Sequence, residues 1–152
     1  MDAAPSRPLV YAAHPLTTYG TEHERRCLDA IAAAFPEAEV VDPAESFADD
    51  ADWLARWPAL VARLSFVVLF ADEEGNVGAG CLREVADAIA VGLPVLVLDD
   101  RQHLCELEAL RLLPTSLRTA ARVGVVEAGR VVPAALAHPT RHRTRGGHHE
   151  DV

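Results

Sequence analysis

Short apolar runs alternate with longer segments of helical periodicity along most of this 152-residue chain. The strongest run, residues 65–70 (SFVVLF), is apolar on both faces, which is typical of a strand in the middle of a parallel sheet. Other strand-like runs occupy residues 9–13, 39–43, 94–99 and 122–126. Strands that alternate with helical segments at this spacing predict an α/β fold, with helices on both faces of an open sheet.

Helical segments are predicted at residues 21–35, 52–64, 81–91 and 104–113. Thr21 and Glu24 have the spacing of a capping box, in which each side chain accepts a hydrogen bond from the other residue's backbone N–H. Gly92 is suited to end the third helix, because glycine readily adopts a left-handed backbone conformation. We therefore predict a three-layer, doubly wound, mostly parallel sheet of five strands in the order 2-1-3-4-5, similar to flavodoxin and Rossmann folds.

Composition excludes several classes of protein. The chain carries 14 basic and 23 acidic residues, a formal net charge of −9, which is a poor match for binding a nucleic-acid polymer. No apolar run approaches the ~18 residues that span a bilayer, and no charged-then-apolar leader opens the chain. Three cysteines without a C-x-x-C pair suggest neither disulfides nor a zinc site. We therefore expect a cytoplasmic protein without membrane contact, bound metal or cofactor.

The expected organisation is a single domain at residues 8–137. A short N-terminal extension at residues 1–7 precedes it, and a tail at residues 138–152 follows it. The tail is rich in Pro, Thr, Arg, His and Gly and has no apolar period, so it is expected to be disordered.

Ligands of open parallel sheets bind beyond the carboxyl ends of the strands, which here are residues 11–20, 42–47 and 71–84. The last segment contains glycines that let a ligand approach the backbone, and it leads into a helix whose first N–H groups are free. On spacing alone, a glycine-rich turn that merely enters a helix is the simpler interpretation. The candidate residues in these segments are Tyr11, His14, Asp42, Asp72, Asn76, Gly78, Gly80, Cys81 and Glu84.

Four short pieces of this sequence occur in a characteristic order: VYAAHPLT at 10–17, DP at 42–43, GCLRE at 80–84 and GLPV at 92–95. Together they resemble the nucleoside 2-deoxyribosyltransferase-like superfamily, and the resemblance covers roughly residues 8–99. That superfamily includes transferases, nucleoside 5′-monophosphate N-glycosidases and uncharacterised members.

The resemblance implies roles for individual residues. Glu84 matches the catalytic glutamate that attacks the anomeric carbon of the sugar and forms a covalent glycosyl-enzyme. Tyr11 matches a first-strand tyrosine near that carboxylate, and Asp72 lies in a loop whose acids contact the base and assist its departure. His14 replaces a glycine common in the superfamily, which places an acid or a base-contacting group in the pocket. The expected substrate-binding set is His14, Asp42, Asn76, Gly78, Gly80 and Cys81.

Two functions are compatible with these features. One is an enzyme that cleaves or exchanges the N-glycosidic bond of a nucleoside or nucleoside 5′-monophosphate, as a hydrolase or a transferase. The alternative is a non-catalytic module that binds a nucleotide-derived ligand, with Glu84 as a hydrogen-bond acceptor. Trp53 and Trp57 share a helical face and favour core or subunit contacts. Arg83 is expected to be a solvated helix arginine or to form an ion pair rather than to bind a phosphate. The resemblance also implies a homo-oligomer, a dimer or larger.

Overall fold

The structure of the protein is a computed structural model that describes residues 7–119 and 121–133. Most of the N-terminal extension predicted at residues 1–7, and all of the tail predicted at 138–152, lie outside the described residues. The elements, in chain order, are β1 (Leu9–Ala13), η1 (Leu16–Thr18), α1 (Glu22–Ala34), β2 (Glu39–Val41), α2 (Pro43–Ser46), α3 (Asp50–Val61), β3 (Phe66–Leu69), β4 (Asn76–Val77), α4 (Ala79–Ala90), β5 (Val95–Leu98), β6 (Leu104–Leu112), η2 (Thr115–Leu117) and β7 (Gly124–Val131). Among these residues, no helix has the length and apolar character needed to cross a membrane.

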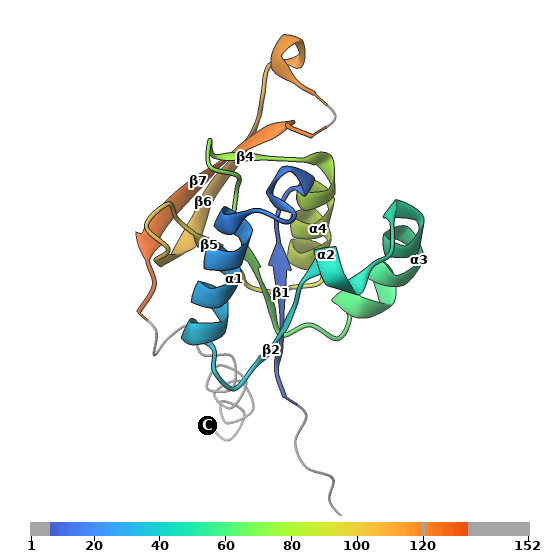
Figure 1. The fold of residues 1–152 in the computed structure, drawn as a ribbon, viewed down its shortest axis with the longest axis vertical. Coiled ribbons are helices and arrows are strands. Elements are labelled where there is room, and N and C mark those ends of the chain that lie inside the picture. Colours follow the sequence, from blue (N-terminus) through green and yellow to red (C-terminus); the bar gives the residue numbers. More distant parts are fainter. Residues whose placement is uncertain (1–6, 120, 134–152) are drawn as a thin grey trace, which may run out of the picture.

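The α/β class predicted from the sequence is confirmed, and one half of the sheet is parallel. β1 pairs in parallel with β2 and β3, and β3 pairs in parallel with β5 (Figure 1). Every residue of β3 is buried, as predicted for a strand that is apolar on both faces. These are the first four predicted strands, and they lie side by side in the order β2-β1-β3-β5.

The other half of the sheet is antiparallel, and here the prediction was wrong. The sheet has seven strands in the order β2-β1-β3-β5-β6-β7-β4, not five mostly parallel strands in the order 2-1-3-4-5. The helix predicted at residues 104–113 is strand β6, which pairs antiparallel with both β5 and β7. Its residues Glu106, Leu107 and Glu108 alternate in exposure, and the cross-strand ion pair between Arg111 and Glu127 joins it to β7. Antiparallel pairing with β5 and β7, the strands before and after it along the chain, outweighs the helix propensity of this Leu-, Glu- and Ala-rich segment.

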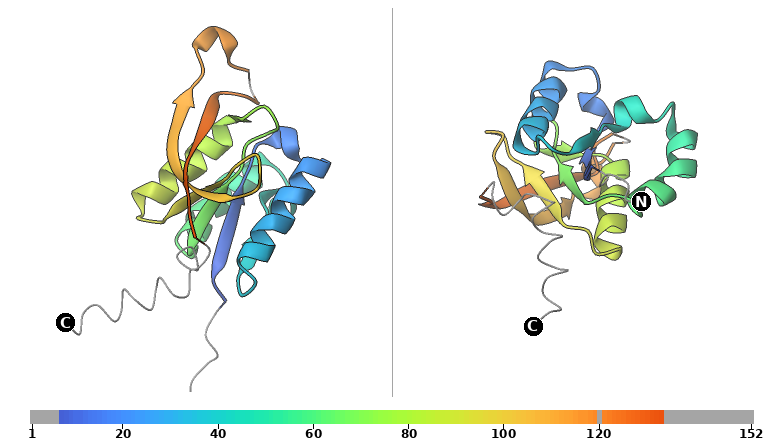
Figure 2. Two further views of the ribbon diagram at one scale, coloured as in Figure 1. Left: turned by 90° about the vertical axis from the view of Figure 1, so that its left-hand side faces the viewer. Right: turned by 90° about the horizontal axis from the view of Figure 1, so that it is seen from below.

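Helices cover both faces of the parallel half of the sheet (Figure 2). On one face, α1 packs Ile31 and Phe35 against side chains of β1 and β3 such as Val68. On the other face, α3 and α4 contribute Trp57 and Val85, among others, to a second core cluster. Alternate residues of each strand point to opposite faces, so neighbouring residues of β1 serve different clusters. Tyr11 therefore faces the α3 and α4 layer.

Two helix starts differ from the predictions in ways that affect the site. At α1, the Thr21 hydroxyl accepts a bond from the Glu24 N–H, as predicted, but the Glu24 carboxylate accepts from the Gly20 N–H instead of the Thr21 N–H. At α4, the helix begins at Ala79, two residues earlier than predicted. Glu84 therefore lies in the second turn rather than the first, where the helix dipole favours a carboxylate less.

Gly92 and Gly80 provide a matched test of the α4 boundaries. Gly92 has φ of +85° after the helix, whereas Gly80 is inside it, and a Cβ at either position would meet no atom within 4 Å. We expect Gly92→Ala to destabilise the protein by about 1 kcal/mol, because alanine is strained in the left-handed region. Gly80→Ala is expected to stabilise the protein by roughly 0.5 kcal/mol. Denaturant unfolding would measure both, and a destabilising Gly80→Ala would contradict the assigned helix start.

Candidate functional site

The side chain of Glu84 is buried between two hydrogen-bond donors from distant parts of the chain. The Tyr11 hydroxyl, from β1, donates to Glu84 Oε2. The indole N–H of Trp53, from α3, donates to the same oxygen at 2.9 Å. Glu84 itself is only 5% exposed. The close approach of Tyr11 and Glu84 is the arrangement that the resemblance implied.

The two oxygens of the Glu84 carboxylate are not equivalent. Both donors bond to Oε2, and Oε1 makes no hydrogen bond within the described residues. Glu84 therefore has one oxygen fixed by two donors and one oxygen that no donor of the described residues holds.

Burial dominates the proton equilibria of this site. Desolvation raises the pKa of Glu84 to about 7, although the hydrogen bonds from Tyr11 and Trp53 act in the opposite direction. Burial and the adjacent Glu84 carboxylate raise the pKa of the Tyr11 hydroxyl, so this group stays protonated and acts as a donor. Burial likewise raises the pKa of the Cys81 thiol, which excludes a reactive thiolate there near neutral pH.

The raised pKa of Glu84 predicts how stability depends on pH. Because its pKa is about 7 in the folded protein and about 4.5 in the unfolded chain, its contribution to stability is full below about pH 4.5 and is lost as pH rises through 7. The loss amounts to roughly 3 kcal/mol. The glutamine side chain of Glu84→Gln does not ionise. We therefore expect its free energy of unfolding to be equal to or below that of wild type at pH 4.5 and above that of wild type at pH values higher than 8. Urea unfolding of both proteins across this range would measure the difference, and a difference independent of pH would contradict the assignment.

His14 and Asp42, both predicted to bind substrate, contact each other at the carboxyl ends of β1 and β2. His14 Nε2 lies 2.9 Å from Asp42 Oδ1, and His14 Nδ1 lies 2.7 Å from the Thr18 hydroxyl oxygen. Tyr19 lies next to this pair, with its ring centroid 5.0 Å from that of His14. Burial and the negative charges of Glu84 and Asp42 raise the pKa of Tyr19, so the two groups of residues lie close enough to influence one hydroxyl.

Asp72 is not brought to Glu84. Its Oδ1 accepts hydrogen bonds from the backbone N–H groups of Glu74 and Asn76, and its Oδ2 lies 3.1 Å from Arg122 Nε. Carboxylates that bond to N–H groups two residues further along are typical of turns. Asp72 therefore orders the loop after β3 and pairs with Arg122, and its predicted catalytic role has no supporting contact.

A cavity of about 750 Å³ lies beside the loop after β3, on the α1 side of the sheet. His23, Asp72, Asp99 and Arg101 are among the residues that line it, whereas Tyr11 and Glu84 do not. This cavity and the Glu84 carboxylate are therefore different places in the molecule. The cavity lining also includes the buried thiol of Cys27, whose sulfur lies 3.8 Å from His23 Nε2. Burial raises the pKa of this thiol to about 11, which disfavours a reactive thiolate near neutral pH.

The remaining predicted binding residues lie at the start of α4. Gly78 precedes the helix as its N-cap, and a Cβ there would lie 3.1 Å from the Ala121 carbonyl oxygen, so this glycine permits close packing of two loops. Gly80 is exposed, Cys81 is buried three residues before Glu84, and Asn76 belongs to β4. The negative charge of Glu84 contributes to the raised pKa of the Cys81 thiol, so these two side chains are neighbours.

Two residues of these clusters were not predicted as site residues. Trp53 was expected to form core or subunit contacts, but its N–H bonds to Glu84. Glu24 was predicted as a helix cap, and it caps α1 through Oε1 while Oε2 points toward His14. Arg83, in contrast, forms the exposed ion pair that was expected, with Asp87 at 3.1 Å.

Comparisons with models of known protein families, with curated proteins and with solved structures gave no match to this chain. Its class is therefore defined by the structure: an α/β protein with a buried glutamate on helix α4 that bonds through one oxygen to Tyr11 of β1 and Trp53 of α3.

Proposed function

We propose that this protein cleaves or transfers the N-glycosidic bond of a nucleoside, with Glu84 as the nucleophile. The observation that carries the proposal is the asymmetry of the Glu84 carboxylate, in which Tyr11 and Trp53 fix Oε2 while Oε1 has no hydrogen-bond partner among residues 7–119 and 121–133. A carboxylate held in this way has a defined orientation toward a substrate, which is the main requirement for nucleophilic attack.

The reaction would proceed in two displacements. Glu84 Oε1 attacks the anomeric carbon, the carbon–nitrogen bond breaks, and the base leaves with the electron pair and takes a proton from solvent. Water or a second base then attacks the same carbon, and Glu84 leaves as a carboxylate. Tyr11 and Trp53 stabilise the carboxylate that is present before the first step and after the second.

An uncharged nucleoside suits this site better than a nucleoside 5′-monophosphate. Arg83, the cation nearest to Glu84 in sequence, pairs with Asp87, and its side chain is 54% exposed. The chain has a formal net charge of −9, which disfavours an anionic substrate unless local donors offset it. We also propose, following the resemblance, a cytoplasmic homo-oligomer.

A panel of nucleosides and their 5′-monophosphates, each with and without an acceptor base, tests this function directly. We expect chromatography to detect free base or an exchanged nucleoside, with nucleosides reacting faster than monophosphates. Release of base only when an acceptor is present would identify a transferase. Thermal stabilisation by nucleosides without any product would contradict catalysis and support the binding module instead.

A further inference from the structure

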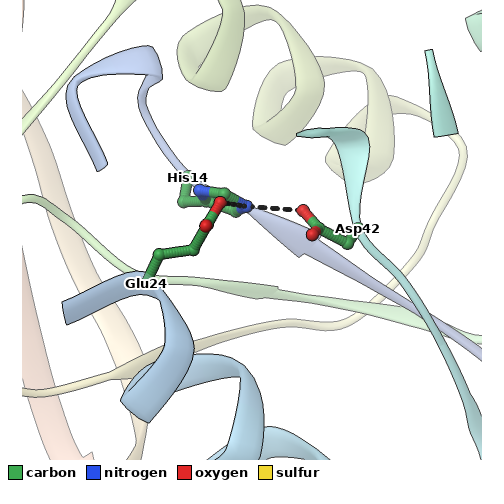
Figure 3. A group of neighbouring side chains, drawn as sticks. All are labelled: His14, Glu24 and Asp42. Carbon is green, nitrogen blue, oxygen red and sulfur yellow. Dashed lines mark hydrogen bonds and ion pairs between the residues drawn. The ribbon is translucent and has the colours of Figure 1, made fainter. Parts of the chain in front are cut away.

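A second cluster of side chains converges at the carboxyl ends of β1 and β2, outside the Glu84 site. His14 follows β1, Asp42 follows β2, and Glu24 extends from α1, so that both carboxylates point toward the imidazole (Figure 3). One ligand-type atom from each of the three residues lies within 4.8 Å of the other two. The His14 side chain is fully buried and stacks on Phe70, with ring centroids 4.5 Å apart.

The hydrogen bonds around His14 determine which ring nitrogen carries a hydrogen and which faces the carboxylates. The Thr18 hydroxyl donates its proton to the Pro15 carbonyl oxygen at 2.7 Å. Thr18 can therefore only accept from His14 Nδ1, which must carry a hydrogen. In a neutral imidazole, Nε2 is then a lone pair directed at Asp42 and Glu24. Such a lone pair among carboxylates needs a positive charge beside it, either a proton on Nε2 that is donated to Asp42 at 2.9 Å or a bound cation.

Glu24 supplies the second, independent observation. Its Oε1 accepts the Gly20 N–H at 2.9 Å, whereas Oε2 is fully buried and has no hydrogen-bond partner within the described residues. Glu24 as a whole is 9% exposed, and Oε2 lies 3.8 Å from His14 Nε2. An unpaired buried carboxylate oxygen costs free energy unless a donor or a cation satisfies it. The bond from Gly20 to Oε1 therefore holds Oε2 at a buried place where no donor of the described residues reaches it.

We propose that His14 Nε2, Glu24 Oε2 and Asp42 Oδ1 form a binding site for a divalent transition-metal ion. Ligand atoms at ~2.0–2.2 Å from one ion lie about 3–4 Å apart, which matches the separations of 2.9 Å and 3.8 Å found here. One imidazole and two carboxylates favour zinc, manganese or iron over magnesium and calcium, which prefer oxygen ligands alone. The Thr18 hydroxyl orients the imidazole from behind, as outer partners of metal-binding histidines do.

The site has three protein ligands, so the ion has positions left for water or for an oxygen of a bound molecule. It does not depend on the reaction proposed for Glu84, because no residue is shared between the two clusters. Its occupation adds a positive charge near Tyr19, on which the charges of both Asp42 and Glu84 act.

Zinc and magnesium titrations of the full-length, chelator-treated protein test the site by calorimetry. Glu24→Gln keeps the oxygen that caps α1 but removes the charge of the proposed ligand. Glu22→Gln changes an exposed acid on the same helix, which pairs with Arg25, and serves as the matched control. Histidines elsewhere in the chain bind zinc equally in all three proteins, so only the difference between the variants reports on this cluster.

We expect wild type and Glu22→Gln to bind one more zinc ion than Glu24→Gln, or to bind that ion at least ~10-fold more tightly, with no comparable magnesium binding. Zinc should raise the unfolding midpoint of wild type but raise that of Glu24→Gln less. X-ray absorption of the zinc complex should show one imidazole nitrogen among oxygen ligands. Equal zinc affinity and stoichiometry in wild type and Glu24→Gln would overturn the proposal, as would equal stabilisation by zinc. Because no nucleoside is used, the result is independent of the glycosidic activity.

Discussion

Glu84→Gln is expected to lower the rate of base release from nucleosides by roughly 10³-fold or more. The amide oxygen can still accept the hydrogen bonds from Tyr11 and Trp53, so the geometry around Oε2 is retained. The amide is a far weaker nucleophile than a carboxylate, however, and it cannot form the ester with the sugar. Initial rates of base release under saturating nucleoside would measure the loss.

Asp29→Asn is the matched control for this change. Asp29 is a carboxylate on the exposed face of α1, where it forms an ion pair with Arg25. We expect its rate to equal that of wild type. If Glu84→Gln retained more than about a tenth of the wild-type rate, Glu84 would not be the nucleophile.

Trp57→Ala is expected to lower the free energy of unfolding by about 3–5 kcal/mol, the largest effect on stability that we predict. Trp57 is 1% exposed and fills the layer between the sheet and α4. Its ring lies 4.9 Å from that of Tyr11, so the cavity left by alanine also removes support from the residue that orients Glu84. Guanidinium unfolding followed by circular dichroism would measure the change.

Trp57→Phe separates packing from hydrogen bonding at the same position. It keeps an aromatic ring beside Tyr11 but loses the N–H that donates to Asp87 at 2.9 Å. Asp87 still pairs with Arg83, so we expect a cost of only about 1–2 kcal/mol. This variant should fold even if Trp57→Ala does not. Equal stability of wild type and Trp57→Phe together with a small effect of Trp57→Ala would contradict the packing described here.

The parallel half of the fold follows from local patterns in the sequence. The run at residues 66–70 is apolar at every position because β3 is buried on both faces. The capping residue Thr21 and the left-handed Gly92 mark helix ends. β6 could not be recognised in this way. Its residues have high helix propensity, and antiparallel pairing with the strands before and after it, β5 and β7, makes it a strand.

The candidate site likewise contains contacts that the sequence predicted and contacts that only the packing of distant elements creates. Glu84 and Tyr11 were predicted to lie together, and they do. Trp53 was not assigned to the site, because its contact with Glu84, 31 positions further along the chain, depends on how α3 packs against α4. Asp72 was placed at the site from its position after β3, but the turn that it stabilises directs it toward Arg122 instead. Strand ends indicate where a site is formed, and packing decides which side chains reach it.

Trapping of a covalent intermediate tests the central claim most directly. A 2-deoxy-2-fluoro analogue of the nucleoside that the protein cleaves should form the glycosyl-enzyme faster than water removes the sugar. Mass spectrometry of the intact protein should then show the mass of one added sugar, and peptide mapping should place it on Glu84. The adduct should be absent from Glu84→Gln. Release of base without any adduct, or an adduct on another residue, would contradict Glu84 as the nucleophile.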